Sequence, residues 1–544
     1  MPRDLEADQA MLRNVLSLAE AREFQRAGAI ADEALEGGFE HPLLFNVVAT
    51  LREMQGRYDE AARLLERAVV IAPDDVGCRN ALALVLQRLD RAEEALHHVD
   101  ELLRRHPDLG FAHANRGNAL IALGKLGQAR LSHLRALELE PGNLVAFAAL
   151  ASIATRRGEH DEARGWAERA LALAPGFPDP IMSLAAADLA AGDLAMAERR
   201  LRALLADGRV APADRARAYG LLGDVQDAAG RYADAFKAYA ACNELLRQVH
   251  RRFGSGTTLL EYTRALTAAT RAAAPSSWAV PAPKAPAVPQ SGAAGHVFLM
   301  GFPRSGTTLL EVALDGHPAV ASAEELELLT DSVLRFMREP LDLRALAKAS
   351  DAELAPLRAA YWTRVRSAGI DVAGKVFVDK HPLNTLKLPL IARLFPEARV
   401  LFALRDPRDV VLSCFRRRFK MNAAMYELLT LGGAAAFYDA VMGYAEQLRP
   451  TLGLAWQSVR HEDLVADFDA GMRGICNFIG VPWVEGLGDF GGRVQTREQA
   501  TPSTAQLSRG LDASGIGHWR HYAPELEPIA LTLGYWVRGY AYPP

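Results

Sequence analysis

The chain has 544 residues, which is enough for two to four domains at roughly 100–200 residues per domain. Half of the residues are apolar and 24% are charged, a balance that excludes a wholly disordered chain. The 62 basic and 66 acidic residues give a net charge of −4, which excludes a general binder of nucleic acid or membranes. A site for a polyanion must therefore be a local concentration of Arg and Lys.

The four cysteines, Cys78, Cys242, Cys414 and Cys476, lie far apart in the sequence. No Cys-x-x-Cys motif and no histidine cluster at ligand spacing accompanies them, so we expect neither a disulfide framework nor a metal site. The first residues lack the apolar core of a signal peptide, and no run of 18 apolar residues occurs. We therefore expect a cytoplasmic protein without membrane contact.

A period of 34 residues runs through the first half of the sequence. Glycine or aspartate ends each unit's first predicted helix, alanine follows five residues later, and proline closes the second helix. The small alanine allows the two helices of a unit to approach closely. The repeated positions are Gly56, Asp90, Gly124, Gly158 and Gly192, then Ala61, Ala95, Ala129, Ala163 and Ala197, then Pro73, Pro107, Pro141 and Pro175.

This period resembles the tetratricopeptide repeat, as in the turn and helix start at residues 56–61 and the helix end at residues 68–73. The resemblance implies an α-solenoid of six to seven helical hairpins over about residues 7–250, and we assign residues 1–250 to it. A solenoid's concave face usually holds a peptide or protein partner. Recruitment of a substrate and self-association into a homo-oligomer both stay open.

Residues 251–295 are predicted to join the solenoid to a second domain. A helical stretch continues to about residue 272, and five prolines follow within residues 273–292, which excludes helix and sheet there. We expect a linker or a strap lying on a neighbouring surface, and Trp278 favours anchoring.

An anion-binding loop is predicted after the linker. The apolar run at residues 297–300 indicates a buried strand, and residues 307–315 indicate a helix. A strand, a glycine loop and a helix in this order point backbone N–H groups and a helix N-terminus at one anion. The loop adds hydroxyl donors and a planar cation. Its candidate binding residues are Arg304, Ser305, Gly306, Thr307 and Thr308. Residues 296–544 are thus predicted to form an α/β domain with a central parallel sheet and a P-loop-like anion-binding loop.

A missing lysine and a second copy of the loop sequence show which features of the predicted anion-binding loop are specific. Thr307 follows Gly306 where a Walker A motif has lysine, so the loop lacks the side chain that a nucleoside triphosphate site requires. Residues 255–261 repeat residues 305–311 without a change, but they follow a polar helical run and lack the preceding Pro-Arg. We expect this second copy to have no binding function.

The segment from Pro303 to Thr308 resembles the sulfotransferase family's loop for the 5′-phosphosulfate of 3′-phosphoadenosine 5′-phosphosulfate (PAPS). With arginine at position 304, it is most similar to tyrosylprotein sulfotransferases and their bacterial relatives with tetratricopeptide repeats. The resemblance covers about residues 296–525. It implies transfer of a sulfuryl group from PAPS, without a metal, to the hydroxyl of a protein tyrosine, a glycan or a smaller metabolite.

A second strand and helix, at residues 400–413, carry further residues of the resemblance. Arg405 at the strand end and Ser413 eight residues later match the family's ligands for the 3′-phosphate. Arg417 matches a further contact with the nucleotide. A surface salt bridge within residues 416–418 is an equal alternative for Arg417.

The resemblance also implies the catalytic residues. Lys380, at the end of a third strand, matches the lysine that contacts the transferring group, and Glu325 lies 21 residues after Arg304, as the family's catalytic base does. Glu324 and His381 stay open as alternative bases.

Near the end of the chain, Ser503 matches a serine that assists the transition state. His518 lies where a basic residue contacts the nucleotide, but the family has lysine there.

The acceptor and two other functions stay open at this point. Leu326 and Glu327 follow the expected base, so no basic residue there receives an acidic peptide, and sulfation of proteins rests on the architecture alone. A P-loop kinase of a small metabolite and a repeat scaffold with an inactive second domain are the alternatives to a sulfotransferase.

Overall fold

The computed structural model of the protein describes residues 5–273, 278, 292–339, 341, 343–490 and 510–544. These residues divide into two compact units, the first ending at Ala191 and the second beginning at Gly192. Most of the predicted proline-rich linker and the whole segment around Ser503 lie outside the described residues.

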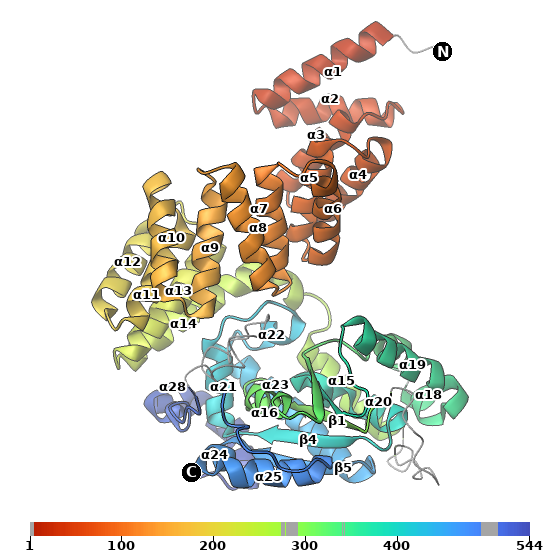
Figure 1. Ribbon diagram of the computed structural model, residues 1–544, viewed down its shortest axis with the longest axis vertical. Helices are drawn as coiled ribbons and strands as arrows, with labels where there is room; N and C mark the ends of the chain where they lie inside the picture. The colour runs from red at the N-terminus through yellow and green to blue at the C-terminus, as the bar shows by residue number, and fades with distance from the viewer. Residues whose placement is uncertain (1–4, 274–277, 279–291, 340, 342, 491–509) are drawn as a thin grey trace. The chain divides into compact units, whose positions relative to one another are not determined.

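The first unit is built from helices that pair in chain order as hairpins, as the 34-residue period predicts (Figure 1). The α-solenoid expected from the sequence is confirmed. Its helices are α1 (Leu5–Glu20), α2 (Phe24–Glu36), α3 (Pro42–Met54), α4 (Tyr58–Ile71), α5 (Val76–Arg88), α6 (Ala92–Arg105), α7 (Gly110–Ala122), α8 (Leu126–Leu139), α9 (Leu144–Arg157), α10 (His160–Leu173) and α11 (Pro178–Ala190).

The repeated residues occupy the conformations that their chemistry allows. Gly56, Gly124, Gly158 and Gly192 have φ between 74° and 80°. Asp90 stands at the equivalent turn with φ 59°, and aspartate is among the few residues that tolerate this left-handed region. The repeated alanines are fully buried, which allows the close helix approach expected from the sequence.

The second unit begins with helices that continue the helical pattern and then forms a parallel sheet. The helices before the sheet are α12 (Leu194–Ala206), α13 (Pro212–Ala228), α14 (Tyr232–Val249) and α15 (Leu259–Ala272). The strands are β1 (Gly295–Gly301), β2 (Val320–Glu324), β3 (Val376–Lys380), β4 (Arg399–Leu404) and β5 (Ala455–Arg460), in the order β2-β3-β1-β4-β5. All four neighbouring strand pairs are parallel, so the predicted α/β domain is confirmed.

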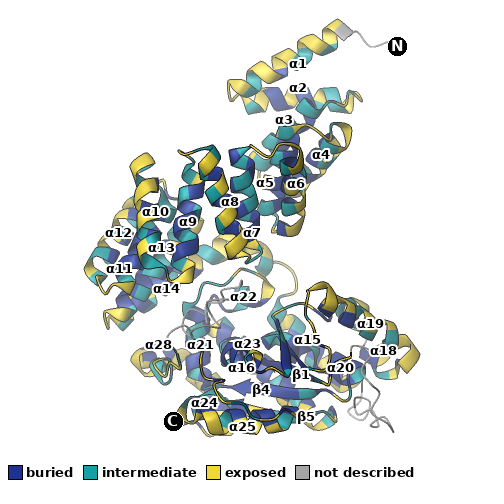
Figure 2. Cartoon of the chain, in the orientation of Figure 1, coloured by how far each residue is buried: buried dark blue, intermediate teal, exposed yellow. Residues whose placement is uncertain are grey.

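Helices cover both faces of this sheet, and every residue of β1 and β4 after the first is buried (Figure 2). Val297 and Leu299 point to the face covered by α16, α24 and α25, whereas Phe298 and Met300 point to the face covered by α19, α20, α21 and α23. Burial on both faces explains why these strands are continuously apolar. The helices of the domain are α16 (Thr307–Asp315), α17 (Thr330–Phe336), α18 (Leu343–Lys348), α19 (Asp351–Ser367), α20 (Leu388–Leu394), α21 (Pro407–Arg416), α22 (Ala423–Glu427), α23 (Leu431–Leu448), α24 (His461–Ala466), α25 (Phe468–Ile479), α28 (Ala523–Leu526) and α29 (Ala530–Gly539).

The strand order places a switch point at the carboxyl ends of β1 and β4. From β1 the chain passes to β2 and β3 on one side, and then to β4 and β5 on the other. In open α/β sheets, ligands bind in the crevice at such a point. The fold therefore directs attention to the residues that follow β1 and β4.

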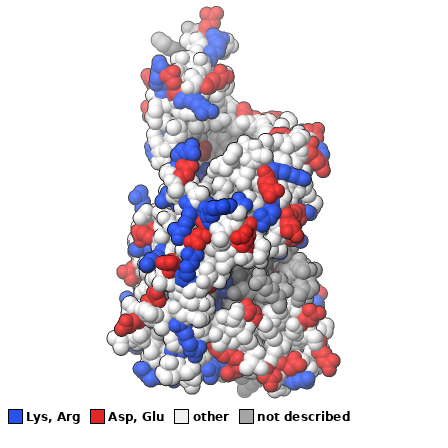
Figure 3. All heavy atoms as spheres, turned by 90° about the vertical axis from the view of Figure 1, so that its left-hand side faces the viewer, with Lys and Arg blue, Asp and Glu red and all other residues white. Residues whose placement is uncertain are grey.

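The distribution of charged side chains and the hydropathy of the helices agree with the overall composition. Acidic and basic side chains are interspersed on the face drawn in Figure 3. No helix in the described ranges is both long and apolar enough to cross a membrane.

The turn conformation predicts a difference between two glycines of the repeats. Gly124 has φ 77°, whereas Gly142 does not adopt a positive φ, and an added Cβ at Gly142 meets no atom within 4 Å. We expect Gly124→Ala to lower the free energy of unfolding by about 1–2 kcal/mol, because alanine is strained in the left-handed region. Gly142→Ala is the matched control, and the unfolding midpoint is measured by circular dichroism. Equal midpoints for the two variants contradict this interpretation.

Candidate functional site

The loop after β1 leads through a glycine of positive φ into the N-terminus of α16. Gly301 allows β1 and β4 to approach, because a Cβ there would lie 2.6 Å from the carbonyl oxygen of Ala403. Gly306, with φ 100°, is the N-cap of α16, so the loop leads directly into a helix N-terminus. Ser305, Thr307 and Thr308 are buried beside it. The strand, loop and helix expected at residues 295–315 are therefore present.

The residues after β4 lie against this loop. Nη1 of Arg405 donates to the carbonyl oxygen of Arg304 at 3.4 Å. Nε of Arg304 donates to Oγ of Ser413, on α21, at 3.0 Å. The structure thus brings together the two segments that the family resemblance assigns to the 5′ and 3′ ends of one nucleotide.

Two guanidinium groups act on Arg304 in the loop after β1. Burial, together with Arg417 and Arg405, lowers the pKa of Arg304 to about 9. Burial also lowers the pKa of Arg417, which forms no ion pair with a carboxylate in the described part of the chain. Such a concentration of like charge favours a bound anion.

His461 belongs to the site and was missed by the sequence analysis. A Cβ on Gly306 would lie 2.9 Å from its Nδ1, and this nitrogen is buried without a hydrogen-bond partner among the described residues. Burial and the nearby Arg405 and Arg304 lower the pKa of His461 to about 3, so the ring is neutral. Its position directly after β5, at the carboxyl edge of the sheet, is the signal that identifies it.

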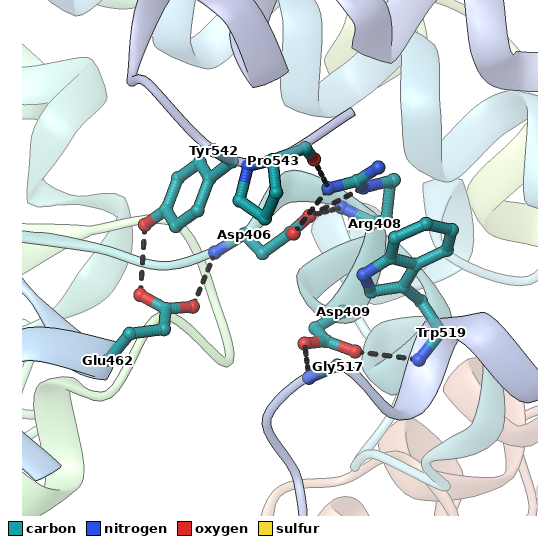
Figure 4. A network of polar contacts seen from close by, with 8 residues as sticks. All are labelled: Asp406, Arg408, Asp409, Glu462, Gly517, Trp519, Tyr542 and Pro543. Atoms are coloured by element: carbon teal, nitrogen blue, oxygen red, sulfur yellow. Dashed lines mark hydrogen bonds and ion pairs between the residues drawn. The ribbon is translucent and has the colours of Figure 1, made fainter. Parts of the chain in front are cut away.

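A polar network ties the C-terminal segment to the start of α21 (Figure 4). The Asp409 carboxylate accepts hydrogen bonds from the backbone N–H groups of Gly517 and Trp519, at 2.6 and 2.8 Å. The guanidinium of Arg408 lies 3.7 Å from the centre of the Trp519 ring. Gly515, in the same C-terminal segment, accepts a hydrogen bond from Arg405 through its carbonyl oxygen. The network holds Arg405 against the loop.

A second group of charges lies at the ends of β2 and β3. Nζ of Lys380 is fully buried, 2.8 Å from Oε1 of Glu325 and 3.3 Å from Oε2 of Glu311. The Glu325 side chain is 44% exposed, so it faces the surface while Glu311 lies beneath the lysine. The structure places the expected base and the expected catalytic lysine in direct contact.

The pKa shifts of this pair keep both groups charged. Burial disfavours the Glu325 carboxylate, but Lys380 outweighs it and lowers the pKa. Burial disfavours the Lys380 ammonium, but Glu311 and Glu325 outweigh it and raise the pKa. Glu325 has φ 41° and Arg304 has φ 71°, and backbone strain of this kind in non-glycine residues often accompanies functional sites.

The other candidates from the sequence have different surroundings. His381 lies 3.3 Å from Glu327, which also pairs with Lys387. Glu324 is the last residue of β2 and is partly exposed. His518 lies 3.0 Å from Asp227 of α13. Ser503 falls outside the described residues.

The second copy of the loop sequence forms a helix cap. Thr258 is the N-cap of α15 and exchanges hydrogen bonds with Glu261, and a short helix rather than a strand precedes it. This agrees with the expectation that the strand and the Pro-Arg distinguish the anion loop.

Asp379, the residue before Lys380, predicts a pH dependence of stability. It is buried and accepts hydrogen bonds from Tyr361 at 2.8 Å and Asn384 at 3.1 Å, and burial raises its pKa to about 6. Because the folded chain then holds this proton more tightly than the unfolded chain, Asp379 favours folding more strongly as pH falls from about 6 to about 4.

We therefore expect the wild type to become more stable relative to Asp379→Asn as the pH falls from about 6 to about 4. Urea unfolding at several pH values measures it. A difference that is constant between pH 6 and pH 4 contradicts the assignment of a raised pKa to Asp379.

Parts of the chain are similar to known proteins. Residues 296–485 match the model of the sulfotransferase family, and residues 54–115 and 146–181 match tetratricopeptide repeats. The chain is 27% identical over 248 residues to an uncharacterized protein of Aquifex aeolicus, covering 44% of this chain and 32% of that protein. It is 28% identical over 273 residues to protein-tyrosine sulfotransferase A of Caenorhabditis elegans, covering 44% of this chain and 67% of that protein.

Two further similarities concern separate parts of the chain. Protein-tyrosine sulfotransferase of Drosophila melanogaster is 30% identical over 200 residues, covering 34% of this chain and 38% of that protein. A solved thermophilic tetratricopeptide repeat protein of Thermus thermophilus is 24% identical with a TM-score of 0.31, covering 33% of this chain and 98% of that one. The chain thus matches about a third of the length of the Aquifex and Drosophila proteins and two thirds of the Caenorhabditis protein.

Proposed function

We propose that this chain, in which residues 296–485 match the sulfotransferase family and tetratricopeptide repeats precede them, transfers a sulfuryl group from PAPS to a hydroxyl acceptor. One observation carries this proposal. Arg405 donates to the carbonyl oxygen of Arg304, so two anion-binding segments 101 residues apart meet at one point of the sheet. A nucleotide with phosphate groups on both its 5′ and its 3′ oxygens needs two such segments.

The residues of the site fit this sulfuryl donor. Gly306 allows a phosphate to approach the backbone closely, and the loop offers N–H groups at the start of α16. Nε of Arg405 and Nδ1 of His461 are buried without a hydrogen-bond partner among the described residues, so both can contact a ligand. In our proposal the loop from Arg304 to Thr308 binds the 5′ end, and Arg405, Ser413 and Arg417 bind the 3′-phosphate.

The site provides the charges that sulfuryl transfer requires. PAPS supplies the sulfuryl group when it is bound. Negative charge builds on the bridging oxygen of the leaving nucleotide as such a group departs, and fixed cations and N–H donors stabilise it. Arg304 and the loop N–H groups lie where they can do so. Lys380 reaches the same edge of the sheet from β3, and its two carboxylate partners hold its ammonium in place.

Glu325 is the proposed general base. Its carboxylate is ionised at neutral pH because of Lys380, and its exposure leaves room for an acceptor hydroxyl to donate a proton to it. His381 is engaged with Glu327, whereas Glu325 contacts the proposed catalytic lysine directly. The named relatives are protein-tyrosine sulfotransferases, so a protein tyrosine is one acceptor to test, beside glycans and small hydroxyl compounds.

Calorimetric titration of the full chain tests the sulfuryl donor. We expect adenosine 3′,5′-bisphosphate to bind without Mg²⁺ and more tightly than ATP, because the loop lacks the Walker lysine. Arg405→Ala is expected to weaken binding by about 10- to 100-fold, as loss of a charged hydrogen bond costs about 1.5–3 kcal/mol.

Arg399→Ala is the matched control for this titration. Arg399 lies at the other end of β4, where it donates to the carbonyl of Ile479, and its loss should leave nucleotide affinity unchanged. Preferential binding of ATP with Mg²⁺ contradicts the proposal and favours a kinase.

The base is tested by kinetics with a hydroxyl acceptor identified by product analysis. Glu325→Gln should lower kcat by about 10²–10⁴-fold and leave bisphosphate affinity nearly unchanged, because glutamine cannot take the proton. Glu324→Gln and His381→Asn are measured beside it. A larger loss of kcat in either of these two variants shows that Glu325 is not the base.

A further inference from the structure

The hairpin formed by α13 and α14 contacts the end of α21 at three neighbouring residues. Nδ2 of Asn243, which is buried, donates to the carbonyl oxygen of Phe415 at 2.9 Å. Arg416 pairs with Asp227 at 2.6 Å, and Arg418 pairs with Asp224 at 2.5 Å. The hairpin thus fixes the backbone and side chains on both sides of Arg417.

These contacts are shaped to receive the arginines. A Cβ on Gly220 of α13 would lie 2.4 Å from Cδ of Arg418, so the missing side chain makes room for that arginine. The hydroxyl of Tyr239, on α14, donates to Asp224 at 3.0 Å, and its ring lies 5.4 Å from the guanidinium carbon of Arg416. Carboxylates held in this way give ion pairs of defined geometry.

Arg417 is the member of this arginine triplet that forms no ion pair with the hairpin among the described residues, although the charge of Asp224 acts on it. Shortly before it in the chain, Ser413 and Cys414 contact Arg304 and Pro303 of the loop after β1, and the charge of Arg417 contributes to the lowered pKa of Arg304. With Arg416 and Arg418 neutralised by α13, the triplet presents a single guanidinium to a ligand.

Asp227 also holds the C-terminal segment. Its carboxylate lies 3.0 Å from Nε2 of His518 and accepts a hydrogen bond from the hydroxyl of Tyr522. The same segment supplies the carbonyl of Gly515, to which Arg405 donates. One carboxylate of α13 therefore supports both sides of the proposed 3′-phosphate site.

From these contacts we infer that Asp224 and Asp227, on a helix that continues the repeat pattern, are positioning residues for the 3′-phosphate of the bound nucleotide. They act through Arg417 and Arg405 and do not touch the ligand. The last hairpin is then a part of the binding site and not a separable module for recruiting partners. This inference rests on the proposed function for the identity of the nucleotide.

The test compares two nucleotides on the full chain. Calorimetry with adenosine 3′,5′-bisphosphate and with adenosine 5′-phosphate, which lacks the 3′-phosphate, measures how strongly that phosphate contributes. We expect the Asp224→Asn and Asp227→Asn double variant to bind the bisphosphate about 10- to 100-fold more weakly, the range typical for loss of groups that orient direct ligands. Affinity for adenosine 5′-phosphate should change less than about twofold, within the scatter of surface substitutions.

Two outcomes overturn the inference. Equal weakening for both nucleotides shows a general loss of structure, and unchanged or tighter binding of both shows that the carboxylates only reduce the local positive charge. Asp188→Asn is the matched control, because it removes a buried carboxylate from an ion pair with Arg164 in the first unit. If the double variant does not fold, as thermal unfolding will show, Asp224→Asn alone leaves the contacts of Asp227 intact and must still lower affinity selectively for the bisphosphate.

Failure of the inference is distinct from failure of the proposed function. If the wild type does not bind the bisphosphate, the sulfuryl donor is wrong. If the wild type binds it and the variants discriminate between the two nucleotides as the wild type does, only the role of Asp224 and Asp227 is wrong.

Discussion

Burial of Arg304 close to other cations is the constraint on which the site depends. Arg304 and Arg405 lie in the segments that follow β1 and β4, and burial together with the charges of Arg417 and Arg405 lowers the pKa of Arg304 to about 9. Holding them together costs free energy that a bound polyanion recovers, because each guanidinium then gains a charged hydrogen bond. The arrangement therefore favours binding over stability, as functional sites commonly do.

Much of the second unit keeps these charges in place. Gly301 allows β1 to lie against β4, which sets the distance between the loop and Arg405. The network around Asp409 fixes the start of α21 (Figure 4). The hairpin of α13 and α14 fixes its end. Lys380, in contrast, pairs with two carboxylates. The charges of Lys380 and Glu325 cancel, and Glu311 beneath the lysine adds one negative charge. One edge of the sheet thus combines a cationic binding region with a paired acid and base.

Local signals predicted much of this structure, and long-range pairs are what they missed. The 34-residue period predicted the helical hairpins. Glycine and hydroxyl residues after an apolar strand predicted the loop from Arg304 to Thr308. Asp224 and Asp227 are 194 and 189 residues from their arginine partners, and their local sequence does not distinguish them from other polar positions of a helix. No periodicity encodes such pairs. His461 was not assigned to the site from the sequence, because its burial beside Gly306 arises only in the folded chain.

A crystal structure of the full chain with adenosine 3′,5′-bisphosphate tests the central claim most directly. The account predicts one nucleotide across the switch point, with its 5′-phosphate against the N–H groups of residues 304–308. Its 3′-phosphate should lie within hydrogen-bond distance of Arg405, Ser413 and Arg417. A nucleotide bound elsewhere, or one whose 3′-phosphate contacts none of these three side chains, contradicts the account.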